Sequence, residues 1–110
     1  MMGQAFNRLV ALSDAKDIEG LGSFLHEDYM FILDYDFMTK EDWLKWVNEE
    51  FKKSEPFLSN PVLTFEDEHL CIFNQTFELD GKPTMSINTT HLKDGKPWRT
   101  MITRVAVHEK

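Results

Sequence analysis

The chain contains four histidines and one cysteine that could act as metal ligands or nucleophiles. His26, His69, His91 and His108 show no ligand spacing such as His-x-x-x-His, and no cysteine cluster accompanies them. Cys71 lies in the middle of a predicted strand without a neighbouring base, which favours a buried, inert thiol over a nucleophile. The chain also lacks a glycine-rich phosphate loop and a Gly-x-Ser-x-Gly elbow. The sequence therefore predicts no metal site and no bound cofactor.

The other residues that could bind a ligand are polar side chains inside predicted strands, so their positions depend on how the strands pair. The tetrapeptide Asp-Gly-Lys-Pro occurs at 80–83 and again at 94–97. Asp-Gly between runs rich in β-branched and aromatic residues is typical of a hairpin with a type I′ turn, which needs φ > 0 at both central positions. Two such turns predict a three-stranded antiparallel meander, formed by the runs 70–79, 84–93 and 98–108.

The prolines of the repeat fix the register of the two hairpins. With Asp-Gly as the first turn, Leu79 pairs with Lys82 and Glu78 lies opposite Pro83. The second of these pairs is not hydrogen-bonded, so the N–H that proline lacks is not needed there. Pro97 fits the second hairpin in the same way. This register assigns every meander residue to one of two faces, and a shift of one residue would exchange the faces.

Composition limits the classes of function. The 110 residues are 42% hydrophobic and 28% charged, which is typical of one soluble globular domain. A net charge of −7 makes nucleic acid an improbable partner, and no apolar run reaches the ~20 residues of a membrane span. Residues 1–10 lack the apolar core of a signal peptide, and a single cysteine cannot form an internal disulfide. We therefore expect a cytoplasmic protein with no nucleic-acid or membrane partner.

The elements outside the meander place helices first and mostly strands afterwards. Helices are expected at three places: from about Gln4 to Asp14, from an Asp17 N-cap through Leu25, and from a Thr39 N-cap to about Lys53. Strands are expected at 29–33 and 62–66, with a turn at 34–36 and a short returning strand at 37–38. This order predicts an α+β fold, with a curved, mostly antiparallel sheet wrapped around three N-terminal helices.

Three segments carry a family pattern: 7–12 with 17–21 behind it, 24–29 leading into the first strand, and 94–99 before the last strand. In these segments, and over nearly its whole length, the chain resembles the nuclear transport factor 2-like superfamily, in its small SnoaL-like branch. The resemblance implies a single domain over 1–110 with a cone-shaped, cystatin-like fold that encloses a pocket. The superfamily hosts isomerases, cyclases, dehydratases, hydrolases and non-enzymatic binding domains, so the fold leaves the chemistry open.

Comparison with the ketosteroid isomerase branch of that superfamily argues against its specific reaction. That reaction uses a carboxylate base and two acidic hydrogen-bond donors. The position of the tyrosine donor is Leu9 here, and the position of the aspartic acid donor is Asn88, a weaker donor. The base aligns near Leu33, with Asp34 one place later. Asp34 remains a candidate catalytic base if its turn directs it inward, although an aspartate that shapes the turn is the simpler interpretation.

The same alignment directs the Asn88 face of the meander into the pocket. The polar residues expected there are Gln75, Ser86, Asn88, Thr90, Arg99 and Thr103, framed by Phe73, Phe77, Met101 and, from the third helix, Trp43. An apolar cavity with a few convergent polar groups is typical of a small-molecule site, and Arg99 is the inward residue that could bind an anion. The alternative is that the serine and threonine residues are ordinary strand formers and that the aromatic residues fill the space.

The opposite face of the meander is also partly apolar, whereas a sheet with one solvated face should have one clearly polar side. We therefore expect a homodimer that forms through this convex face, with Ile72, Met85, Ile87, Trp98 and Ile102 in the interface. Three functions follow from the sequence: a homodimer that binds a small, mainly apolar ligand; an isomerase- or cyclase-type enzyme that uses an aspartate base; and a non-catalytic association module.

Overall fold

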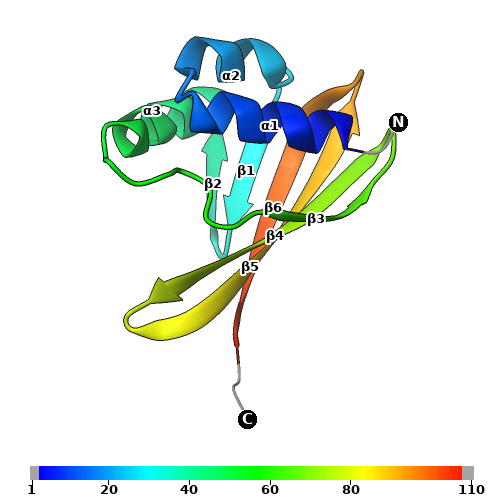
Figure 1. The fold of residues 1–110 in the computed structure, drawn as a ribbon. Coiled ribbons are helices and arrows are strands. Elements are labelled where there is room, and N and C mark those ends of the chain that lie inside the picture. Colours follow the sequence, from blue (N-terminus) through cyan, green and yellow to red (C-terminus); the bar gives the residue numbers. More distant parts are fainter. Residues whose placement is uncertain (1–2, 108–110) are drawn as a thin grey trace.

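The computed structural model describes residues 3–107, and it confirms the predicted α+β class. Three helices precede or interrupt the first strands: α1 (Gln4–Asp14), α2 (Ile18–Phe24) and α3 (Lys40–Phe51). The strands are β1 (Met30–Leu33), β2 (Asp36–Thr39), β3 (Val62–Glu66), β4 (Leu70–Leu79), β5 (Lys82–Lys93) and β6 (Lys96–Ala106). They form one mixed sheet in the order β2-β1-β6-β5-β4-β3, in which only the β1–β6 pair is parallel. The sheet is strongly curved, and all three helices lie on its concave side (Figure 1).

α2 and α3 begin where the sequence predicts because the side chains of their N-cap residues bind the first backbone amides. The Asp17 carboxylate accepts a hydrogen bond from the Gly20 amide at 2.8 Å, and the Thr39 hydroxyl accepts one from the Asp42 amide at 3.3 Å. α1 begins differently, because its N-cap is Gly3, which has no side chain. Its first amides are instead bound by a residue of β3, as described below.

Both Asp-Gly pairs form the predicted turns. Asp80 and Gly81 have φ values of 53° and 76°, and Asp94 and Gly95 have values of 55° and 74°. The first hairpin has the predicted register throughout, with Leu79 opposite Lys82 and Glu78 opposite Pro83. The short β1–β2 hairpin is tighter than expected, since β2 already begins at Asp36. The predicted third run ended at His108, which lies outside the described residues.

The second hairpin departs from the predicted register after two pairs. Lys93 pairs with Lys96 and Leu92 with Pro97, but His91 then lies opposite Arg99 instead of Trp98. Trp98 is the extra residue of a β-bulge, which places two residues of β6 against one residue of β5. From this point to its end, β6 presents the opposite face from the one predicted. The prediction of inward Arg99, Met101 and Thr103 is therefore wrong.

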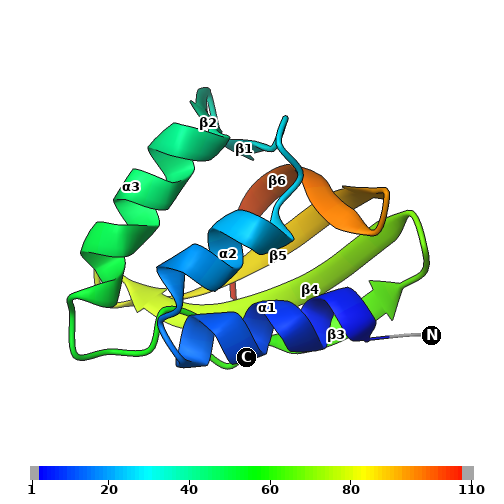
Figure 2. The same ribbon diagram turned by 90° about the horizontal axis from the view of Figure 1, so that it is seen from above.

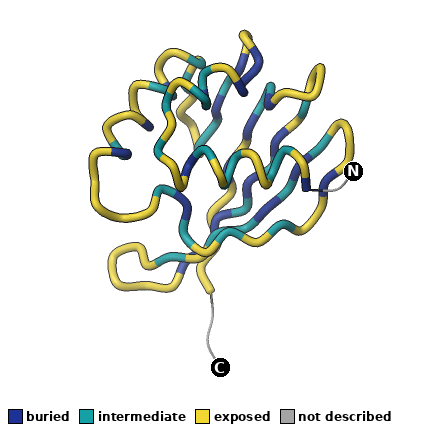
Figure 3. The backbone as a smooth tube through the Cα atoms, turned by 45° about the horizontal axis from the view of Figure 1, so that its top comes forward, coloured by how far each residue is buried: buried dark blue, intermediate teal, exposed yellow. Residues whose placement is uncertain are grey.

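Two apolar clusters join the helices to the concave face of the sheet, one toward each edge of the sheet. α1 packs against β3 and β4, whereas α3 packs against β1 and β2, and α2 lies between them (Figure 2). One cluster centres on α2, α3, β1 and β6, with Leu21, Val47 and Ile102 among its buried members. The other centres on Cys71 and Phe73, under α1. The concave face of β5 lies between the two clusters, and along β5 buried residues alternate with more exposed ones (Figure 3).

Candidate functional site

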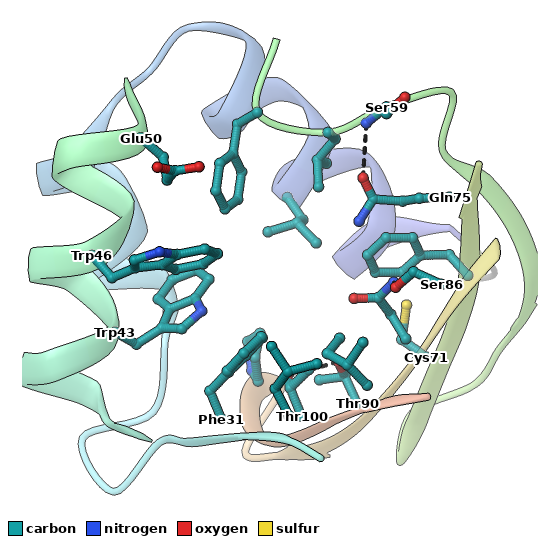
Figure 4. A pocket seen from close by; sticks show the side chains of 18 of the residues that line it. Phe31, Trp43, Trp46, Glu50, Ser59, Cys71, Gln75, Ser86, Thr90 and Thr100 are labelled. Atoms are coloured by element: carbon teal, nitrogen blue, oxygen red, sulfur yellow. Dashed lines mark hydrogen bonds between the residues drawn. The ribbon is translucent and has the colours of Figure 1, made fainter. Parts of the chain in front are cut away.

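A cavity of about 450 Å³ lies between the helices and the concave side of the sheet. Its lining includes Trp43 and Trp46 of α3, Phe31 of β1, Phe57 of the loop after α3, and the inward residues of β4, β5 and β6. In Figure 4 the two tryptophans form one wall, Gln75, Ser86 and Cys71 lie opposite, and Phe31, Thr90 and Thr100 lie along a third side. The volume is within the range of small-molecule sites.

Most of the residues predicted for the pocket line this cavity. They are Trp43, Phe73, Gln75, Phe77, Ser86, Asn88 and Thr90. Three of the predicted residues, Arg99, Met101 and Thr103, are not among the lining residues, because the bulge at Trp98 turns them to the convex face. Thr100, Ile102 and Arg104 take their places on the concave side. The sequence of β6 does not indicate whether Arg99, Met101 and Thr103 or Thr100, Ile102 and Arg104 face inward. The pairing of β6 with β5 in the structure decides between the two sets.

The candidate base Asp34 does not line the cavity. It is exposed at the tip of the β1–β2 hairpin, where its φ of 55° fits an aspartate that shapes a turn. The condition on which Asp34 could act as a base, a turn that directs it inward, is therefore not met, and the simpler interpretation of an aspartate that shapes the turn fits the structure. The cation predicted inside the pocket is also elsewhere, since Arg99 stacks on the Trp98 ring at 4.0 Å and donates a hydrogen bond to the carbonyl oxygen of Asp28.

The polar side chains of the strand wall bind mostly to one another or to backbone. The Asn88 amide donates to the Ser86 hydroxyl at 3.3 Å, and the hydroxyls of Thr90 and Thr100 lie 2.9 Å apart. The Gln75 carbonyl oxygen accepts a hydrogen bond from the Ser59 amide at 2.7 Å, which holds the loop after α3 against β4 (Figure 4). These contacts keep most of the polar atoms of this wall satisfied while the wall remains uncharged.

Two titratable side chains in the interior are kept neutral. Burial raises the pKa of the Tyr29 phenol far above its ordinary value, although a hydrogen bond with Thr100 partly lowers it. Burial, with a smaller contribution from the Glu66 carboxylate, raises the pKa of the Cys71 thiol to about 12. Both groups are therefore protonated at neutral pH, so neither provides a base or a thiolate nucleophile.

The charged residues of the lining lie toward solvent. Lys53, Glu55, Glu78 and Arg104 are exposed, and Glu50 is half-buried and bound to Lys53 at 2.7 Å. The interior of the cavity is thus lined by apolar side chains and a few hydroxyl and amide groups, and the charged residues lie at its rim. Among residues 3–107, no group of three or more His, Cys, Asp or Glu side chains is placed to hold a metal ion. Within the same range, no helix is long and apolar enough to cross a bilayer.

Comparison with known proteins identifies the fold through structure, since no protein-family model and no curated protein matches the sequence. An NTF-2 like protein from Burkholderia xenovorans LB400 superposes with a TM-score of 0.72 at 12% identity, covering 97% of this chain and 84% of its own. A protein from Silicibacter pomeroyi DSS-3 with a cystatin-like fold has a TM-score of 0.70 at 9% identity, with coverages of 94% and 75%.

A steroid delta-isomerase from Pseudomonas aeruginosa is also similar, with a TM-score of 0.68 at 12% identity and coverages of 92% and 77%. Identities this low establish the architecture and leave the activity open. The chain therefore has the nuclear transport factor 2-like fold, the cone-shaped α+β architecture that also bears the name cystatin-like.

Proposed function

We propose that this protein binds a small, mainly apolar molecule in its cavity and acts without catalysing a reaction on it. The observation that carries the proposal is the cavity of about 450 Å³, whose interior is aromatic and amide- or hydroxyl-lined and whose charges lie at the rim. Apolar surface drives binding in such a site, and a few polar groups orient the ligand. The steroid isomerase among the structural neighbours makes a hydrophobic ligand a reasonable expectation for this shape.

The isomerase or cyclase alternative is less well supported because residues 3–107 place no base inside the cavity. Asp34 is exposed outside the cavity, and Tyr29 and Cys71 are protonated at neutral pH. General-base catalysis needs a group whose pKa lies near the working pH and which reaches the substrate proton. Glu50 lines the rim and is held by Lys53, which leaves it poorly placed for that role.

A ligand screen tests the proposal with two matched variants. Ser86→Leu fills the cavity from β5, whereas Thr103→Leu makes the same kind of change on the convex face of β6. A compound present at 100 times its Kd should stabilise the wild type by about 2.7 kcal/mol in a thermal-shift assay. The same compound should stabilise Thr103→Leu and fail to stabilise Ser86→Leu. If a broad library of apolar metabolites stabilises neither the wild type nor Thr103→Leu, the proposal is refuted.

The proposed homodimer uses the convex face of the sheet. Ile72, Met85 and Ile87 are half-buried there, and the bulge adds Met101, which is 53% exposed, and Val105, which is 42% exposed. An exposed apolar sheet face of this kind favours self-association. Of the interface residues expected from the sequence, Ile102 is instead buried in the core. The predicted Trp98 lies at the bulge, between Lys93 and Arg99.

Light scattering provides the test of this assembly. The wild type is expected to be a dimer. Met101→Glu is expected to be a folded monomer, because a carboxylate in this apolar interface would be buried without its hydration shell, which opposes association. A monomeric wild type at micromolar concentration would contradict the dimer and leave the ligand proposal standing. An association module without a ligand, the remaining alternative, predicts the dimer but no binder in the screen.

A cytoplasmic location stays part of the proposal, motivated by the free, buried Cys71.

A further inference from the structure

The indole nitrogen of Trp43 is a buried hydrogen-bond donor at the wall of the cavity. Trp43 is 4% exposed, and its Nε1 has no hydrogen-bond partner among the described residues. In Figure 4 the ring extends from α3 toward the cavity, and the nitrogen is on the side that faces the cavity. A buried donor without an acceptor costs about 1–3 kcal/mol, so native proteins rarely leave one without a reason.

This donor differs from the polar side chains of the strand wall, each of which already takes part in a hydrogen bond. Gln75, Asn88 and Thr90 each take part in a hydrogen bond within the strand wall or with the loop after α3. An incoming ligand would therefore meet side chains that are already held through at least one of their polar atoms. At Trp43 it would supply a missing acceptor, so this position gains the most from a ligand of the right chemistry.

The surroundings of Trp43 restrict what that ligand can be. Phe31 and Tyr29 pack against the Trp43 ring at centroid distances of 5.9 and 5.4 Å, and Phe57 lies 6.4 Å away. Such a wall favours the face or edge of another ring. An ionised group beside Trp43 would be desolvated without a counter-ion, because the charged lining residues lie toward solvent.

We propose that Trp43 Nε1–H is the donor that orients the ligand, and that the ligand is an uncharged ring compound with a carbonyl-type acceptor facing α3. The inference rests on the proposed ligand-binding function and deepens it. The indole group can only donate, so it selects an acceptor and rejects a hydroxyl that presents its hydrogen. The ring system of the ligand occupies the apolar space between the two clusters.

The test uses two bicyclic probes of nearly the same shape, 1-indanone and indane, which differ in one carbonyl group. Indole N–H signals of ¹⁵N-labelled protein are assigned with the variants Trp43→Phe, Trp46→Phe and Trp98→Phe. Titration with 1-indanone should move the Trp43 indole proton downfield, and 1-indanone should bind about 10-fold more tightly than indane. Indane should produce no such downfield shift at Trp43.

Trp46→Phe is the matched control, because Trp46 lies on the same helix and also lines the cavity. It should keep the preference for the ketone, whereas Trp43→Phe should reduce the ratio of the two affinities to within about twofold. If Trp43→Phe is too unstable to titrate, 3-benzothienylalanine at position 43 replaces the N–H by sulfur and keeps the ring shape.

The outcomes separate this inference from the proposed function. Equal affinities for the two probes, with the Trp43 signal moving equally in both titrations, would overturn the inference and leave a ligand-binding cavity. Loss of the ketone preference in Trp46→Phe to the same extent as in Trp43→Phe would also overturn it. If neither probe binds, the inference fails for ring ligands, while the separate library screen still decides the proposed function.

Discussion

Glu66 of β3 caps a helix that is distant from it in sequence. Its two carboxylate oxygens accept hydrogen bonds from the backbone amides of Ala5, at 3.0 Å, and Phe6, at 2.9 Å, and the residue is only 7% exposed. Gly3, the N-cap of α1, provides no side-chain acceptor. The carboxylate therefore satisfies two amides of the first turn and places a negative charge at the positive end of the helix dipole.

Glu66→Gln isolates the value of that charge. The amide keeps the shape of the side chain but has one acceptor oxygen instead of two, so one backbone N–H meets an NH₂ group. Hydrogen bonds to charged groups contribute about 1.5–3 kcal/mol, and a charge at a helix terminus contributes roughly 0.3–1 kcal/mol. We therefore expect the free energy of unfolding to fall by about 2–3 kcal/mol, and Tm to fall by roughly 10 °C.

Urea denaturation followed by circular dichroism measures this loss. Glu68→Gln is the control, because Glu68 is two residues away and exposed, and it should change stability by less than about 0.5 kcal/mol. Amide exchange at Ala5 and Phe6 should accelerate in Glu66→Gln and stay unchanged in Glu68→Gln. If Glu66→Gln unfolds within about 0.5 kcal/mol of the wild type, with the same m value, the capping role is refuted.

Two further predictions concern a thiol and two turns. The pKa of the Cys71 thiol is about 9 in the unfolded chain and about 12 in the folded protein. Between these pH values only the unfolded chain ionises, so the stability that the buried neutral thiol contributes is complete below pH 9 and is lost as the pH rises toward 12. The stability of the wild type relative to Cys71→Ala, measured by urea unfolding, should therefore shrink from pH 8 to pH 11, and a constant difference would contradict it. Gly81→Ala and Gly95→Ala should each cost about 1 kcal/mol in the same assay, because an added Cβ meets no atom within 4 Å and only the positive φ opposes it. Losses above about 3 kcal/mol would contradict that purely conformational cost.

The parts of the fold that the sequence predicts are those set by neighbours in the chain. An Asp-Gly pair determines its own turn and the next few strand pairs, and an Asp17 or Thr39 side chain reaches an amide only three residues away. The helices, the first hairpin and most of the cavity residues on β4 and β5 follow from such local rules. Six of the lining residues on β4 and β5 were predictable because the first hairpin keeps one register over its whole length, once the family resemblance had placed the Asn88 face inside.

Interactions between distant segments were not predictable in the same way. Nothing near Glu66 in the sequence indicates that it caps α1, about sixty residues earlier. The parallel pairing of β1 with β6 likewise joins segments that are far apart in the sequence, since Met30 lies opposite Arg99. The orphaned indole nitrogen of Trp43 is a property of packing, since a tryptophan on an apolar helix face has the same sequence pattern whether its N–H is paired or not.

The bulge at Trp98 determines what kind of molecule the cavity can accept. In the unbulged register, β6 would direct Arg99 into the cone, and a buried guanidinium would favour an anionic ligand. With one extra residue, Arg99 lies on the outside, stacked on Trp98 and bound to the Asp28 carbonyl. Thr100 and Ile102 face the cavity instead, and Arg104 joins its lining only at the exposed rim. Burying an anion without a counter-ion in this interior would cost more free energy than its apolar contacts with the cavity would contribute. One extra residue in β6 thus makes the interior suited to an uncharged ligand, and among the described residues that line the cavity Trp43 Nε1 is a buried donor without a hydrogen-bond partner.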